Sequence, residues 1–150
     1  NMAARLELEY VGADNERHVP IMLHRALFGS IERFFGVLIE HFAGAFPAWL
    51  APIHVRVLPV SSDHQAYADA LLERLASEAF RADLTEADEP LGGRIRKAKL
   101  EKLPYILVVG DTDVEAATVG VNARGSDKPE RDVSVDAFVA RLAEDIAAKR

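Results

Sequence analysis

Basic side chains are concentrated at one place in this sequence of 150 residues, where they could attract the phosphates of a nucleic acid. The stretch from Arg94 to Lys102 contains five basic residues and a single acidic one, Glu101. Phosphate contacts need clustered cations of this kind. Charged helix faces in solvent are nevertheless common, so the pattern alone favours a solvated helix face.

Two other positions have side chains that could take part in a reaction. Arg33 follows Glu32, and its guanidinium stays charged and offers a rigid fork of donors to phosphate oxygens. His24 lies beside apolar residues, where an imidazole can bind zinc. Plainer interpretations exist for both: a surface pair near a helix start, and a hydrogen-bonded core histidine. The residue types alone favour these plainer interpretations.

Composition limits the class of protein. A hydrophobic fraction of 49% with 28% charged residues is typical of a soluble globular chain with a sizeable core. The net charge of -6 argues weakly against a general nucleic-acid binder, and no DNA partner is expected. No apolar run reaches the roughly 18 residues of a membrane span, and no secretory signal is recognisable. The chain has no cysteine, which fits a cytoplasmic protein without disulfides.

The elements that must position these residues fall into two groups, and the first covers the opening third of the chain. Residues 6–11 alternate between apolar and charged types, which predicts a half-buried strand. A turn at residues 12–15 and a second, more buried strand at 21–23 follow. Apolar residues at helical spacing predict a mostly buried helix over residues 25–42. Two strands and one helix cannot enclose a core, so this piece is expected to have lost its packing partner.

The second group begins after Pro52 and alternates strands with helices. Such alternation builds a mostly parallel sheet with helices on its faces. The expected elements are a strand at residues 53–60, a helix ending near residue 80, a strand at 81–84, a helix at 91–98, strands at 105–109 and 118–122, and a final helix that Ser134 caps.

Several motifs, in the expected order, give the sequence a more specific meaning. Residues 20–34 read Pro-Ile-Met-Leu-His-Arg-Ala-Leu-Phe-Gly-Ser-Ile-Glu-Arg-Phe and resemble the third signature motif of class II aminoacyl-tRNA synthetases, in its threonyl form. Residues 46–52 resemble the join to the anticodon-binding domain of that family. Three further motifs resemble sequence motifs of that domain. They are Leu-Gly-x-Arg-Ile-Arg at 91–96, Lys-x-Pro-Tyr at 102–105 and Val-Gly-Asp at 109–111. The resemblance extends over nearly the whole chain.

The resemblance implies roles for the N-terminal residues in the intact enzyme. Arg33 matches the arginine that contacts the phosphates of ATP and stabilises charge during attack on the α-phosphate. Gly29 and Ser30 lie at the start of the same helix and are implied as ATP-binding residues. His24 matches a zinc ligand, but the family's other two ligands are an upstream cysteine and histidine, and this chain has no cysteine. ATP and zinc are therefore expected as cofactors of the intact enzyme, with neither bound by this chain.

The resemblance also implies an RNA-binding site, because single-stranded bases are read by hydrogen bonds to their edges and by stacking. Asp113 could accept hydrogen bonds from a guanine edge, whereas Asn122 and Arg124 could donate. Asp88 stands where the family commonly has Asn, and Asn122 where it has Arg, so a turn residue and a strand-end residue remain alternative interpretations. The expected tRNA-binding residues are Asp88, Arg94, Arg96, Lys99, Asp113, Asn122 and Arg124, with the three from residues 94–99 on one side of a helix.

The sequence thus predicts an α/β protein with two parts. Residues 1–51 are interpreted as the C-terminal remnant of a class II catalytic domain. Residues 52–150 are interpreted as an anticodon-binding domain, a mixed, mostly parallel sheet of about five strands flanked by helices. The intact protein is expected to be a cytoplasmic, homodimeric threonine–tRNA ligase. Its partner would be threonine tRNA, whose anticodons share G and U at the second and third positions, and no membrane is involved.

Two other functions remain open. The same fold occurs in relatives without synthetase activity, so a repurposed protein-interaction domain is the alternative, although the retained Glu32–Arg33 pair would be useless there. A flavodoxin-type domain that binds a small ligand is the third possibility. It is disfavoured because no glycine-rich phosphate loop follows the strands at 53–60 or 105–109, and Gly92-Gly93 is too isolated to form one.

Overall fold

The computed structural model describes residues 2–150, which divide into two compact units between Gly36 and Val37. The first unit contains a short helix and a two-stranded hairpin, and the second contains a five-stranded sheet with its helices. The predicted domain boundary after residue 51 remains a prediction.

The first unit follows the predicted order of strand, strand and helix, with much shorter strands. Its elements are α1 (Met2–Arg5), β1 (Tyr10–Val11), β2 (Arg17–His18) and the start of α2 (Ile31–Phe42). β1 and β2 pair antiparallel, with Tyr10 opposite His18. A ribbon of only two residue pairs gives no face on which a core could form.

Two details of this region differ from the sequence prediction. Residues 21–23 form no strand, and Ile21 and Leu23 are 88% and 90% exposed. α2 begins at Ile31 instead of residue 25, and none of its residues is buried, although a mostly buried helix was predicted. The apolar pattern is present in the sequence, but within residues 2–150 no element packs over it.

The second unit is built on a mixed sheet, which confirms the predicted fold class. Its strands lie in the order β4-β3-β5-β6-β7. β3 pairs in parallel with β4 and β5, and the pairs β5–β6 and β6–β7 are antiparallel. The strands are β3 (Val55–Pro59), β4 (Ala82–Leu84), β5 (Tyr105–Val109), β6 (Thr118–Ala123) and β7 (Glu130–Ser134).

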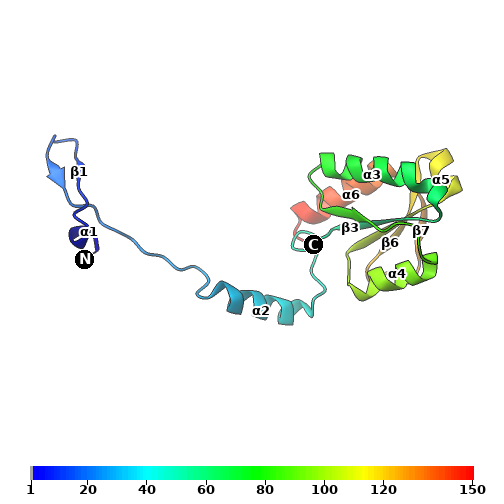
Figure 1. Ribbon diagram of the computed structural model, residues 1–150, viewed down its shortest axis with the longest axis horizontal. Coiled ribbons are helices and arrows are strands. Elements are labelled where there is room, and N and C mark those ends of the chain that lie inside the picture. The colour runs from blue at the N-terminus through cyan, green and yellow to red at the C-terminus, as the bar shows by residue number, and fades with distance from the viewer. Residues whose placement is uncertain (1) are drawn as a thin grey trace. The chain divides into compact units, whose positions relative to one another are not determined.

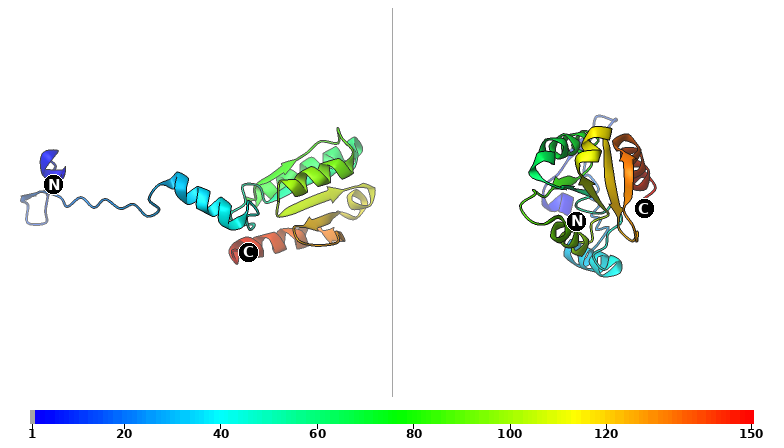
Figure 2. Two further views of the ribbon diagram at one scale, coloured as in Figure 1. Left: turned by 90° about the horizontal axis from the view of Figure 1, so that it is seen from below. Right: turned by 90° about the vertical axis from the view of Figure 1, so that its right-hand side faces the viewer.

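Helices cover both faces of this sheet, in layers that are visible in Figure 1 and end-on in Figure 2. α3 and α6 pack on one face around Leu75, Leu107 and Phe138, whereas α4 covers the other around Leu58 and Ala98. The helices are η1 (Ser62–His64), α3 (Gln65–Ser77), α4 (Leu91–Leu100), α5 (Asp111–Ala116) and α6 (Val135–Ala147). Across residues 2–150, no helix combines the length and apolar character needed to cross a membrane.

Candidate nucleic-acid interface

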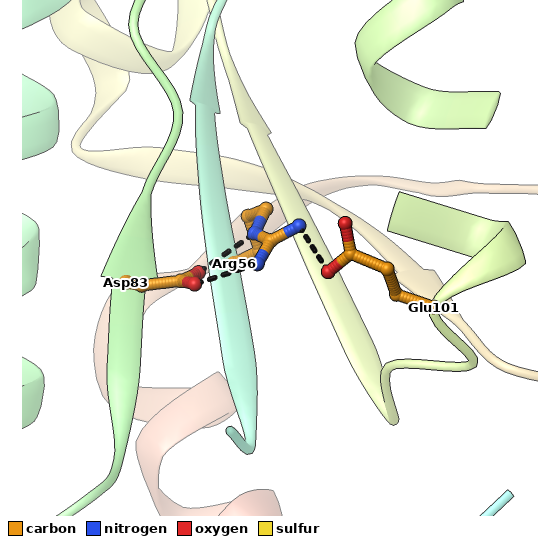
Figure 3. A network of polar contacts seen from close by, with 3 residues as sticks. All are labelled: Arg56, Asp83 and Glu101. Atoms are coloured by element: carbon orange, nitrogen blue, oxygen red, sulfur yellow. Dashed lines mark hydrogen bonds and ion pairs between the residues drawn. The ribbon is translucent and has the colours of Figure 1, made fainter. Parts of the chain in front are cut away.

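Helix α4 is fixed to the sheet by the side chain of Arg56, which lies on β3 (Figure 3). Its Nε and Nη2 atoms donate to both carboxylate oxygens of Asp83 on β4, at 2.8 and 2.7 Å. Nη1 donates to Glu101, directly after α4, at 2.6 Å. These bonds raise the pKa of Arg56, so the guanidinium stays charged. The network holds the C-terminal end of α4 beside the edge strand.

Arg94 lies on the buried side of α4, which corrects the prediction that it shares an exposed face with Arg96 and Lys99. Its side chain is almost fully buried, at 2% exposure, while Arg96 and Lys99 are exposed. Arg94 donates to main-chain carbonyls at the ends of β3 and β4 and before α4. These acceptors are Glu89 at 2.9 Å, Pro59 at 2.8 Å, Val60 at 3.3 Å and Thr85 at 3.4 Å.

The structure brings three of the predicted residues together in one pocket of about 230 Å³. Lys99 from α4, Asn122 from β6 and Arg124 just after β6 all line it. Asn122 pairs with Ile106, whose side chain belongs to the α4 side of the sheet. Directly paired residues point to the same face, which places Asn122 on the α4 side as well. The pocket combines two cations with an amide that can donate and accept.

Two of the three pocket side chains are available to a ligand. Within residues 2–150, neither Lys99 nor Asn122 has a side-chain hydrogen bond. Arg124 donates from Nη1 to the carbonyl of Lys102 at 2.6 Å and from Nη2 to that of Phe46 at 2.8 Å. Burial lowers the pKa of Arg124. A guanidinium has five N–H donors, so this residue could also bind a ligand.

The predicted acidic residues lie at the other end of α4, beyond the carboxyl ends of β4 and β5. Asp88 is exposed and lines an open pocket of about 590 Å³ with Glu86 and Asp69. Asp113 is buried in the first turn of α5, where it accepts from the Gly110 amide at 3.0 Å and the Thr118 hydroxyl at 3.2 Å. Its carboxylate retains acceptor capacity, since it can accept about four hydrogen bonds in all.

The predicted RNA contacts therefore form two groups, one at each end of α4. Thr118 begins β6 beside Asp113, and Asn122 lies four residues farther along, roughly 13 Å at the rise of a strand. The ten residues of α4 span a similar length, about 15 Å. Its exposed cation Arg96 lies between the acidic end and the pocket that Lys99 lines, so one nucleic-acid strand could follow the helix.

The residues predicted to bind ATP lie together at the start of α2. Gly29 has a positive φ of 65°, with open space around the position of a Cβ atom. The amide of Arg33 donates to Ser30 Oγ at 3.4 Å, and that hydroxyl donates to Glu32 at 2.7 Å. This last bond lowers the pKa of Glu32. A left-handed glycine, a capping serine and an exposed arginine at a helix start are suited to phosphate binding.

His24 is exposed and lies outside this helix start. Among residues 2–150, no three His, Asp or Glu side chains lie close enough together to hold a metal ion. The donor set on this chain therefore does not fit a zinc site by itself, and one imidazole would need ligands from elsewhere.

Sequence reasoning missed two groups at the pocket. Ser126 lines it from the turn after β6, and the main chain of Lys102 positions Arg124. Gly125 with a φ of 84° marks the turn, so a glycine two residues after the strand was the available signal for Ser126. A main-chain acceptor contributed by Lys102 has no signal in the sequence.

Comparison with known proteins gives the family. The sequence profile of the anticodon binding domain family matches residues 54–145. The threonine–tRNA ligase of Caldanaerobacter subterraneus is 50% identical over 148 residues, which cover 99% of this chain and 23% of that protein. The threonine–tRNA ligase of Acidobacterium capsulatum is 49% identical over 141 residues, 94% of this chain and 21% of that protein. The chain thus spans under a quarter of the length of these relatives.

Solved structures agree with this result. The RNA binding domain of threonyl-tRNA synthetase from Cryptosporidium parvum superimposes with a TM-score of 0.74 at 25% identity, covering 96% of this chain and 36% of that one. Prolyl-tRNA synthetase from the same organism gives a TM-score of 0.67 at 12% identity, over 98% and 31% of the two chains, which shows a shared fold. With its five-stranded mixed sheet and a profile match over most of its length, the chain belongs to the anticodon binding domain family.

Proposed function

We propose that this chain is the C-terminal part of a threonine–tRNA ligase and that its second unit binds the anticodon of threonine tRNA. The observation on which this proposal rests is the pocket of Lys99, Asn122 and Arg124 at one end of the basic side of α4. Two relatives that are called threonine–tRNA ligases are 50% and 49% identical to the chain, which supports the threonyl assignment.

The two ends of α4 suit different parts of a nucleotide. Lys99 and Arg124 attract phosphates, and Asn122 can pair with a base edge through its amide. At the acidic end, Asp113 can accept from the N–H groups of a guanine, and Asp88 can do the same from an exposed position. Carboxylates repel phosphates, so this end selects for a base edge turned toward the protein.

We assign Arg94 a positioning role in this site. Its guanidinium satisfies main-chain carbonyls at the ends of β3 and β4, so it fixes the start of α4 without reaching the solvent. Arg96, which is exposed two residues later, supplies the electrostatic attraction to the RNA backbone.

In the intact protein, Gly29, Ser30 and Arg33 would bind ATP phosphates at the start of α2. His24 would be one ligand of a zinc ion whose remaining ligands lie outside this chain. Arg33 would stabilise negative charge on the α-phosphate of ATP. The cytoplasmic location and the homodimer belong to the same proposal.

A chimeric enzyme tests the catalytic part of this proposal. Residues 2–150 would replace the matching segment of the Caldanaerobacter ligase, which is 50% identical to it. The chimera should attach threonine to its tRNA, and the change Arg33→Ala should reduce kcat by at least about a hundredfold. A folded chimera that binds threonine tRNA but keeps its activity after Arg33→Ala would contradict the role of Arg33. A folded chimera that binds no tRNA would favour the alternative, a protein-interaction domain.

A further inference from the structure

The segment that connects α2 with β3, residues 43–52, is held against the rest of the second unit by hydrogen bonds and buried side chains and is called the connecting segment below. Ala48 and Ala51 are buried. The Ala48 amide donates to the carbonyl of Arg150, and the Ala51 amide to that of Pro47, both at 3.0 Å. Connecting loops are usually mobile and solvated. The connecting segment is instead fixed to the domain that contains the five-stranded sheet.

Cationic side chains reach this segment from three loops of the domain and donate to its main-chain carbonyls. We call Arg81, Lys102 and Arg124 the carbonyl clamp. Arg81 donates to Ala51 at 3.0 and 2.7 Å and to Trp49 at 3.2 Å. Hydrogen bonds from a charged donor are stronger than those between neutral groups. The clamp therefore stabilises one conformation of the segment.

Arg124 differs from the other members because it also lines the pocket with Lys99 and Asn122. From this position it holds the connecting segment twice. Its Nη2 donates directly to the Phe46 carbonyl at 2.8 Å. Its Nη1 donates to the carbonyl of Lys102 at 2.6 Å, and the ammonium of Lys102 in turn donates to the carbonyl of Ala43.

We propose that Arg124 couples the RNA pocket to the connecting segment, so that RNA bound beside Lys99 and Asn122 stabilises the clamped conformation of residues 43–52. The coupling rests on the proposed RNA-binding function of the pocket, whereas the clamp itself does not. Arg124 is here a positioning residue, which fastens the segment leading from α2 into the domain.

The sign of the coupling follows from the number of donors on a guanidinium. Two of the five N–H groups of Arg124 are used by Phe46 and Lys102, which leaves up to three for an RNA acceptor. RNA can therefore bind Arg124 without breaking the clamp, and an ordered guanidinium is less free to leave it. Linkage requires the reciprocal effect, so the clamped segment also favours RNA binding.

Hydrogen–deuterium exchange of the segment amides tests the clamp in the free protein. Arg124→Lys keeps the charge but loses the planar fork, so exchange within residues 45–51 should become about tenfold faster. Arg141→Lys is the control, because Arg141 also donates from both Nη atoms, here to the Glu130 carboxylate at 2.8 and 2.8 Å, and makes no hydrogen bond to the segment. An unchanged exchange rate within residues 45–51 of Arg124→Lys would overturn the clamp, regardless of whether RNA binds.

If Arg124→Lys fails to fold, Lys102→Met provides the second variant. It removes the bond to Ala43 and leaves the guanidinium in place. It should accelerate exchange at the start of the segment and leave the part held by Arg81 unchanged. No acceleration in this variant would equally overturn the clamp.

The coupling is tested by adding a short RNA hairpin that carries a threonine anticodon, at saturating concentration, with binding measured in the same samples. Wild-type exchange within residues 45–51 should slow by about fivefold or more, whereas that of Arg124→Lys should not. Bound RNA without slower exchange in the wild type would overturn the coupling and leave the proposed function intact. Failure of the RNA to bind would overturn the proposed function and the coupling, while the clamp is judged on the free protein.

Discussion

Arg94 and Arg96, two residues apart on α4, have different roles. Arg94 faces the core, and Arg96 faces the solvent. Arg94 is surrounded by carbonyl acceptors, and Arg96 is exposed. Buried charge is tolerated only when hydrogen bonds compensate for lost hydration. For Arg94 the carbonyls of Glu89, Pro59 and Val60 provide this compensation.

Exchanging each arginine should separate stability from RNA binding. Arg94→Met should lower the free energy of unfolding by about 3 kcal/mol, because it leaves buried carbonyls without donors. Arg96→Ala should leave stability within about 0.5 kcal/mol. It should instead reduce the salt dependence of RNA binding by about 0.7 in the slope of log K against log salt concentration. Urea unfolding and titrations at several salt concentrations check the pair, and equal stability losses would contradict these positions.

Asn122 gives a second test at the residue scale, because its side chain lies in the pocket without a hydrogen bond within residues 2–150. Asn122→Ala should weaken binding of a threonine-anticodon hairpin about fivefold, the loss of one hydrogen bond, with an unchanged melting temperature. Asn122→Arg should strengthen binding and steepen the salt dependence by about 0.7. Fluorescence anisotropy measures both variants. Affinity that is the same in all three proteins would exclude Asn122 from the site.

At the scale of elements, α4 contains two consecutive glycines in its first turn, where glycine is unfavourable. Apart from adjacent residues and the backbone of the helix itself, no atom lies within 4 Å of a Cβ placed on Gly92 or Gly93. Gly93→Ala should therefore raise the free energy of unfolding by about 0.5–1 kcal/mol, through the lower backbone entropy of the unfolded chain. Gly120→Ala on β6 is the contrasting variant. It should not gain this stability, because its Cβ would lie 3.4 Å from the Val108 carbonyl oxygen. A destabilised Gly93→Ala protein would contradict this helix start.

The connection into β3 contains a histidine whose protonation should control stability in acid. His54 is 2% exposed, its Nδ1 accepts from the Arg81 amide at 3.2 Å, and Nε2 has no partner within residues 2–150. Burial, and then the charge of Arg81, lower the pKa of His54 from 6.5 to about 4. The unfolded chain thus binds this proton more readily than the folded one does.

Stability should therefore be nearly independent of His54 above pH 6.5 and fall by about 3 kcal/mol as the pH drops to 4. His54→Gln cannot titrate and should lack this part of the decrease. Urea unfolding between pH 4 and 7.5 measures both proteins. Parallel profiles for wild type and variant would show that His54 keeps an ordinary pKa.

Elements with strong periodicity were predictable from the sequence, and short or polar ones were not. The β-branched run at β3 and the capped α6 follow directly from residue patterns, and Ser134 accepts from the Ala137 amide at 3.2 Å as a cap should. β7 was not predicted as a strand, because most of its residues are charged or polar and lack an apolar alternation. α5 has only six residues, too few to display helical spacing.

The candidate site was predictable in its residue types but not in its grouping. Asp113, Asn122 and Arg124 were all expected to bind tRNA. β6 begins beside Asp113, so Asn122 and Arg124 lie at the other end of that strand. Arg94 could have been placed in the core, since it lies four residues before the buried Ala98. Its charge led to the opposite interpretation. The carbonyls that hold Arg94 and Arg124 come from distant turns, which residue types cannot indicate.

At the scale of the whole molecule, the two units bury their apolar residues to very different degrees. The second unit has two cores, one on each face of its sheet, whereas Ala3 is the one buried residue among residues 2–36. Since the chain covers 23% of the Caldanaerobacter ligase, we propose that the rest of such an enzyme packs over residues 2–42. The second unit already has the buried cores that an independent domain requires.

The most direct test of anticodon reading is a titration of the whole chain with two RNA hairpins. One carries a threonine anticodon, the other differs only at the second anticodon base, and each is measured at two salt concentrations. Salt-sensitive binding that weakens at least about tenfold for the altered base is the predicted result, because a mismatched base leaves polar groups of the site unpaired. Equal affinity for both hairpins would reduce the interface to phosphate attraction and contradict the account.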